Sequence, residues 1–197
     1  MSAVQTRAPE RSHGTPRDLS VSALILGFAA MMWFGWGQAQ PPHGWTLPLT
    51  IGIFAAIAVE GFAGSAVARF RRSETAMDDQ RVRRAYGITV GAEVAAIAIG
   101  AVALGLAGRP AYTAPWILLV VGVHFVPLGR LFGSVDLLWS GLVLCVIAIA
   151  AAVTGAVSAV APSAVTGGFG GLVLVVAAVA SLRRAALRGR PAGGHEG

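Results

Sequence analysis

The chain has 197 residues, of which 55% are hydrophobic and only 12% are charged, and its mean hydropathy is +0.70. Soluble domains carry about 25% charged residues, so this composition excludes a soluble globular enzyme, a disordered chain and a disulfide scaffold. All 15 basic residues behind the net charge of +6 are arginines. They lie at the ends of apolar blocks, which indicates a role in membrane topology and excludes a nucleic-acid-binding module.

Six apolar blocks follow a polar N-terminal segment, residues 1–18, which predicts a disordered cytoplasmic tail. The blocks span residues 19–37, 47–70, 85–108, 115–132, 135–157 and 165–182. Each is close to the roughly 20 residues that a helix needs to cross the hydrocarbon core, where only internally bonded backbone is stable. We therefore predict an all-α fold, a polytopic membrane bundle of six transmembrane helices over residues 19–182. Residues 71–84 form a cytoplasmic loop, and residues 183–197 form a basic cytoplasmic tail.

The arginines divide unequally between the two sides of the predicted membrane. Only Arg109 lies on one side, and fourteen lie on the other: Arg7, Arg11, Arg17, Arg69, Arg71, Arg72, Arg81, Arg83, Arg84, Arg130, Arg183, Arg184, Arg188 and Arg190. Because positive residues stay in the cytoplasm, both termini are predicted to be cytoplasmic. The absence of lysine beside abundant glycine and alanine favours a GC-rich bacterial genome, and hence the bacterial cytoplasmic membrane. The mixed-charge loop is interpreted as a solvated connector, with a short interfacial helix as the alternative.

Three ionisable residues lie deep within the apolar blocks. Glu60 precedes Arg69 by nine residues and Glu93 follows Arg84 by nine, which places each carboxyl about 13 Å from the cytoplasmic boundary. An antiparallel hairpin of the second and third helices would then bring Glu60 and Glu93 face to face, with His124 at a similar depth. The three residues predict a proton-carrying or cation-binding site inside the membrane. The alternative is a carboxyl that only fixes helix packing.

The segment that follows His124 carries further signals. Pro127 removes one helical N–H and frees the carbonyl of Val123, which predicts a kink beside the imidazole. Arg130 and Asp136 flank a tight turn after the fourth helix, and we expect them to pair there. Asp136 is interpreted as an anchor at the membrane interface.

The stretch HFVPLGRLF, together with MWFGWGQAQPP in the first helix and its exit, resembles a family of small multi-pass bacterial membrane proteins of unknown function. Members share the pattern H-F-x-P-L-x-R-x-F, and this chain has Gly129 where alanine is usual. The resemblance implies no activity. It does imply that His124, Pro127 and Arg130 are the positions to test first.

Small residues recur four apart in three places. The pairs are Gly87/Gly91, Gly129/Gly133 and Gly167/Gly171. Such pairs let helices approach closely, and we expect contacts within the chain, with contacts between copies as the alternative. Cys145 is the single cysteine and is expected to pack as a small apolar residue.

The chain has no P-loop, G-x-G-x-x-G, C-x-x-C or H-E-x-x-H motif. We therefore predict a non-enzymatic integral membrane protein with an accessory or structural role, without a metal or other cofactor. The alternative is a small proton-linked permease that uses Glu60, Glu93 and His124. The expected partner is the lipid bilayer. Association with further copies of the chain or with another membrane protein is a possibility that the sequence leaves open. No nucleic acid is expected as a partner.

Overall fold

The computed structural model describes residues 14–73, 75–132 and 134–189, and all regular structure in this part of the chain is helical. The long helices are α1 (Pro16–Gly37), α2 (Thr46–Arg69), α3 (Gln80–Leu106), α4 (Thr113–Leu131), α5 (Val135–Val157) and α7 (Gly171–Arg188). Short turns η1 (Ala76–Asp78) and η2 (Pro110–Tyr112) precede α3 and α4, and α6 (Pro162–Val165) with the π-helical η3 (Thr166–Gly170) leads directly into α7. The described residues thus contain six helices long and apolar enough to cross a membrane, as the sequence predicts.

Both ends of the helical region extend past the predicted blocks. Helix α1 begins at Pro16 because Thr15 and Asp18 form a capping box, in which the Asp18 N–H donates to the Thr15 hydroxyl at 3.2 Å. Residues 16–18 are therefore helical, although the sequence predicted a tail there. Helix α7 continues to Arg188, whose guanidinium donates to the Gly14 carbonyl at 2.5 Å. The rest of the two predicted tails, residues 1–13 and 190–197, lies outside the described residues.

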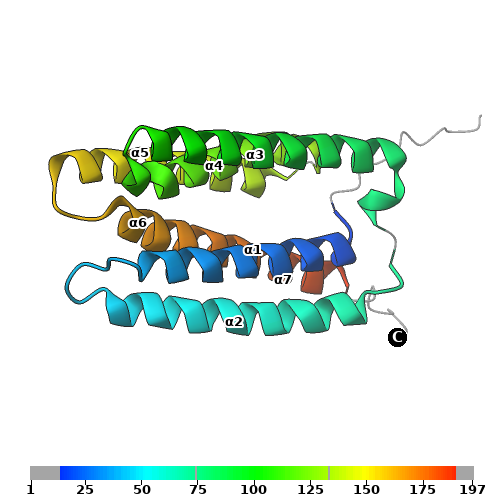
Figure 1. The fold of residues 1–197 in the computed structure, drawn as a ribbon. Coiled ribbons are helices and arrows are strands. Elements are labelled where there is room, and N and C mark those ends of the chain that lie inside the picture. Colours follow the sequence, from blue (N-terminus) through cyan, green and yellow to red (C-terminus); the bar gives the residue numbers. More distant parts are fainter. Residues whose placement is uncertain (1–13, 74, 133, 190–197) are drawn as a thin grey trace, which may run out of the picture.

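The helices form two groups (Figure 1). In the first half, α1 packs along both α2 and α7, and in the second half α4 packs along both α3 and α5. The two halves meet mainly where α6, η3 and α7 contact α4 and α5. A shared apolar core runs through this junction, and its largest fully buried apolar side chains are Leu118, Leu144 and Leu174.

The chain passes from α2 in the first half to α3 in the second through residues 70–73 and 75–79, which we call the connector (Figure 1). Helices α2 and α3 consequently belong to different halves, and α3 packs on α4 instead of α2. The hairpin of the second and third helices that the sequence predicted is therefore wrong, because the connector is long enough to cross the end of the bundle.

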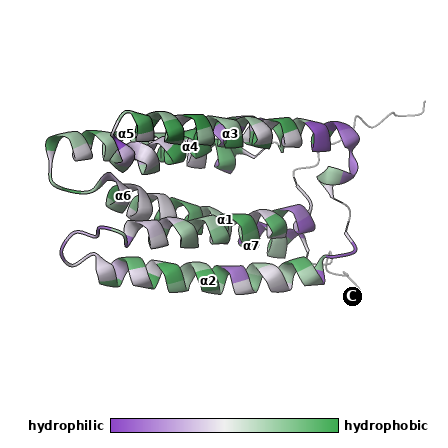
Figure 2. Cartoon of the chain, viewed as in Figure 1, coloured by the Kyte–Doolittle hydropathy of each residue, from purple (hydrophilic) through white to green (hydrophobic). Residues whose placement is uncertain are grey.

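The first residues of α1 and α3 and the last residues of α2, α4 and α7 lie at the same end of the bundle as the connector, which we call the arginine-rich end. Figure 2 shows hydrophobic residues along most of each helix and hydrophilic residues gathered where α1 and α3 begin. The polar ends and apolar middles are those expected of membrane-spanning helices.

Glycines allow the closest helix contacts. A Cβ added to Gly167 would lie 2.5 Å from the Cα of Gly37, and one added to Gly141 would lie 2.5 Å from the carbonyl oxygen of Gly122. Gly171 and Gly129 also face neighbouring atoms of this chain, so both glycines make the expected contacts inside the molecule.

The other predicted pair behaves differently. Gly87 and Gly91 have no atom within 4 Å of where a Cβ would stand, so the expectation that they pack within the chain is wrong. They lie on the side of α3 that faces away from α4, its main long-helix neighbour in the described chain. Gly133 lies outside the described residues.

Candidate functional site

An acid–imidazole pair, with His124 buried and Glu93 partly buried, joins α3 to α4. The His124 Nδ1 and Glu93 Oε2 atoms are 3.4 Å apart, and the side chains are only 8% and 17% exposed. Two of the three predicted site residues therefore come together, on adjacent helices of the second half.

The sequence places this pair through helical spacing on α3. Glu93 shares its face with Ala96 and Gly100, three and seven residues later, and this face packs on α4. The Trp116 indole N–H donates to the Ala96 carbonyl at 3.1 Å, and a Cβ on Gly100 would overlap the same indole. The α3–α4 interface therefore has two polar contacts, one at Glu93 and one at Ala96, about one helical turn apart.

These connections matter because α3 has little other support. Among the residues of α3, only Gly100 is buried. Exposed apolar residues, including Ile99 and Leu106 at 70% and 87% exposure, cover the opposite side. The pair and the Trp116 contact are thus the specific attachments of a peripheral helix.

Glu60 lies in the other half of the molecule. Its Cγ would be 3.0 Å from a Cβ on Gly27 of α1, so the carboxyl side chain packs in the α1–α2 interface. Its Oε1 atom is buried and has no hydrogen-bond partner among the described residues. The predicted contact between Glu60 and Glu93 is wrong, because α2 packs on α1 and α7 whereas α3 packs on α4.

The region after His124 differs from the prediction in one contact. Helix α4 continues through Pro127, which is exposed, and ends at Leu131. Asp136 forms an ion pair with Arg184 of α7, not with Arg130, which is exposed. The first turn of α5 lies near the end of α7, which brings Asp136 to Arg184. The partner of Asp136 is therefore determined by tertiary packing and not by the short turn between α4 and α5.

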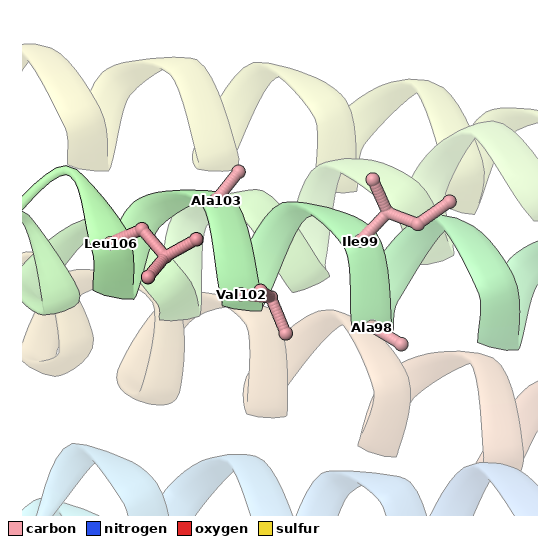
Figure 3. Close-up of a pocket in the computed structure, with 5 residues that line it drawn as sticks. All are labelled: Ala98, Ile99, Val102, Ala103 and Leu106. Atoms are coloured by element: carbon pink, nitrogen blue, oxygen red, sulfur yellow. The ribbon is translucent and has the colours of Figure 1, made fainter.

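Two surface hollows in the described part of the chain are apolar, and neither Glu93 nor His124 lines them. One, of about 400 Å³, is formed by five residues of α3 alone (Figure 3). The other, of about 410 Å³, lies between α2 and α7 and is lined by aromatic side chains such as Phe34, Trp45 and Phe169. Neither hollow offers polar groups that could orient a polar substrate.

The chemistry available at the pair is proton exchange and hydrogen bonding. An imidazole and a carboxyl at this separation can share or exchange a proton. Within the described residues, no three His, Cys, Asp or Glu side chains group as ligands for a metal ion.

Asp18 makes a long-range structural contact that the sequence did not predict. Besides capping α1, its carboxylate accepts hydrogen bonds from the Thr75 hydroxyl at 2.5 Å and the Ala76 N–H at 3.0 Å. Thr75 and Asp78 form a second capping box, at the start of η1. The repeated T-x-x-D pattern at residues 15–18 and 75–78 is the signal that identifies both turns. The contact between them needs the three-dimensional structure.

Comparison of the chain with known protein families, curated proteins and solved structures finds no match. The resemblance inferred from the His124 segment therefore stays a prediction. Fold and site geometry alone carry the functional argument.

Proposed function

We propose that this chain is a non-catalytic integral membrane protein, with an accessory or structural role, in which Glu93 and His124 fasten α3 to the rest of the bundle. The observation that carries this proposal is the 3.4 Å contact between the two largely covered side chains, because Gly100 is the single buried residue of α3. A polar contact between helices is an effective attachment inside a membrane, where the lipid is as apolar as the helix surfaces.

The proposed location is the bacterial cytoplasmic membrane, with both chain ends in the cytoplasm. Eleven described arginines lie at the arginine-rich end and Arg109 lies at the opposite end. The positive-inside rule then supports assigning the arginine-rich end to the cytoplasm. Reporter fusions in the 38–45 turn and in the connector test this orientation, and an active periplasmic reporter in the connector would contradict it.

The fastening role is tested by a double-mutant cycle with Glu93→Leu, His124→Leu and the double variant. We expect a coupling of about 1 kcal/mol in the free energy of unfolding in detergent, the usual scale for polar contacts between membrane helices. Glu93→Gln should retain most of the stability because the amide keeps the shape and polarity of the carboxyl. Glu60→Leu, at similar depth in the other half, is the matched control and should not couple to His124→Leu.

A small proton-linked permease is the second candidate. The acid–imidazole pair favours it, because the two groups can exchange a proton within the membrane span. Glu93→Gln in proteoliposomes separates the two roles, since glutamine keeps the shape of glutamate but does not titrate. A permease would show wild-type proton uptake that this folded variant loses. The permease would be excluded if the wild type moved neither protons nor any of a range of candidate solutes and if the variants differed only in stability.

A further inference from the structure

The arginine-rich end carries a large excess of positive charge over its own acids. Among the described residues at this end there are eleven arginines and four aspartates. We call five of these arginines the connector arginines: Arg71 and Arg72 lie in the connector, and Arg81, Arg83 and Arg84 lie at the start of α3, directly after it. All five are exposed, and within the described chain no carboxylate forms an ion pair with any of them.

The four aspartates are already engaged in contacts within the chain. Asp18 binds Thr75 and Ala76 of the connector, and Asp136 pairs with Arg184. Asp78 accepts from the Thr75 N–H at 3.2 Å, and Asp79 accepts from the Arg81 N–H at 2.7 Å at the start of α3. None of these contacts is an ion pair with a connector arginine in the described chain, so the guanidinium groups of the connector arginines are accessible to an external anion.

The connector is held in place, so its arginines are presented at a defined depth. Besides the Asp18 contacts, the Arg17 guanidinium donates to the Ser73 carbonyl at 3.4 Å. Tyr86, just beyond Arg84, lies beside Phe132 with 6.5 Å between ring centroids. Exposed Trp139 begins the second turn of α5 at the same end. Aromatic rings of this kind mark the membrane interface, so the connector arginines lie at or just beyond the level of the lipid headgroups.

We propose that the connector arginines form a binding surface for the phosphate groups of anionic phospholipids in the facing leaflet. The surface matches that partner in charge, in depth and in the guanidinium geometry that suits phosphate oxygens. The proposal is independent of the role of Glu93 and His124, because none of the five arginines contacts that pair in the described structure.

The experiment measures lipid retained by purified protein in detergent, by native mass spectrometry, with phosphatidylglycerol and phosphatidylcholine as probes. We expect the wild type to prefer phosphatidylglycerol by about tenfold or more, given the attraction that each arginine near an anionic surface contributes. Replacing all five arginines by glutamine should remove that preference, and replacing them by lysine should keep most of it. Arg109→Gln, at the opposite end, is the matched control and should bind like the wild type.

Two further measurements test the proposal if the variant with all five arginines replaced does not fold. The smaller variant Arg83→Gln/Arg84→Gln should reduce the preference in part, and high salt should abolish it in the wild type. Equal retention of both lipids by the wild type at low salt would overturn the proposal. Full displacement of phosphatidylglycerol by millimolar inorganic phosphate would identify a free-phosphate site and would equally overturn the assignment to lipid.

Discussion

The two halves of the bundle are held together by different kinds of contact. In the first half, glycine-mediated packing brings α1, α2 and α7 together: Gly37 against Gly167, Gly52 against Phe34 and Gly27 against Glu60. In the second half, α4 and α5 meet through Gly122 and Gly141, but α3 is attached through the Glu93–His124 and Trp116–Ala96 contacts. The contrast shows that one small bundle of apolar helices combines steric and polar means of helix association.

The steric contacts should be the most sensitive to substitution. Gly167→Val would place its Cβ 2.5 Å from backbone atoms of Gly37 and 2.6 Å from the Trp33 carbonyl oxygen, so two helices must move apart. We expect a loss of about 3 kcal/mol in unfolding free energy, the upper end for overpacking, measured by denaturation in detergent. Gly91→Val adds the same group where no atom lies within 4 Å and should change stability little. Equal effects of the two substitutions would contradict the difference between the halves.

The polar attachment of α3 should be weaker but specific to that helix. Trp116→Phe keeps an aromatic ring beside Gly100 and removes the N–H that donates to Ala96. We expect a loss of about 1 kcal/mol, the usual net value of a hydrogen bond, and faster labelling of a cysteine placed on the α4-facing side of α3. Trp33→Phe in the first half should leave that labelling rate unchanged. If both variants labelled at the wild-type rate, the indole contact would not attach α3.

The Asp18 contact sharpens the comparison, because it links the first half to the connector that leads into the second. Asp18→Asn keeps an acceptor oxygen for one partner but weakens the contacts with Thr75 and Ala76. We expect about 1 kcal/mol of lost stability and faster tryptic cleavage after Arg72, since the connector would open locally. Asp79→Asn, which alters only the cap of α3, is the control. Unchanged cleavage after Arg72 in Asp18→Asn would show that the connector is held by other contacts.

The smallest effect is expected at the ion pair of Asp136 and Arg184, because the two side chains are 40% and 43% exposed. Asp136→Asn should change stability by less than about 1 kcal/mol, and added salt should reduce the difference from the wild type. Arg130→Gln should not alter this small difference, because Arg130 is not the partner. A loss in Asp136→Asn that persists in high salt would indicate a buried role for this carboxylate.

Much of the fold could be predicted from local sequence. Apolar blocks of nearly membrane-spanning length define six helices because backbone in lipid must bond to itself, and the polar breaks between blocks locate the turns. The burial of His124 and Glu93 against protein also followed from their charge, since lipid is a poor neighbour for ionisable groups. The capping boxes at Thr15 and Thr75 can also be identified in the sequence, from the T-x-x-D pattern.

Only the tertiary structure decided which helices are neighbours. Glu60 and Glu93 are equally far from the boundary arginines, which suggested that they meet. The connector instead crosses to the other half, and His124 is the partner of Glu93. In the same way, Arg184 of α7 replaces Arg130 as the partner of Asp136. The physical reason is that, apart from a few ionisable residues, these helices are apolar on all sides, so hydropathy periodicity does not show which helix each one meets. The spacing of glycines predicts that close helix contacts form, but only the structure shows that Gly37 meets Gly167 and that Gly122 meets Gly141.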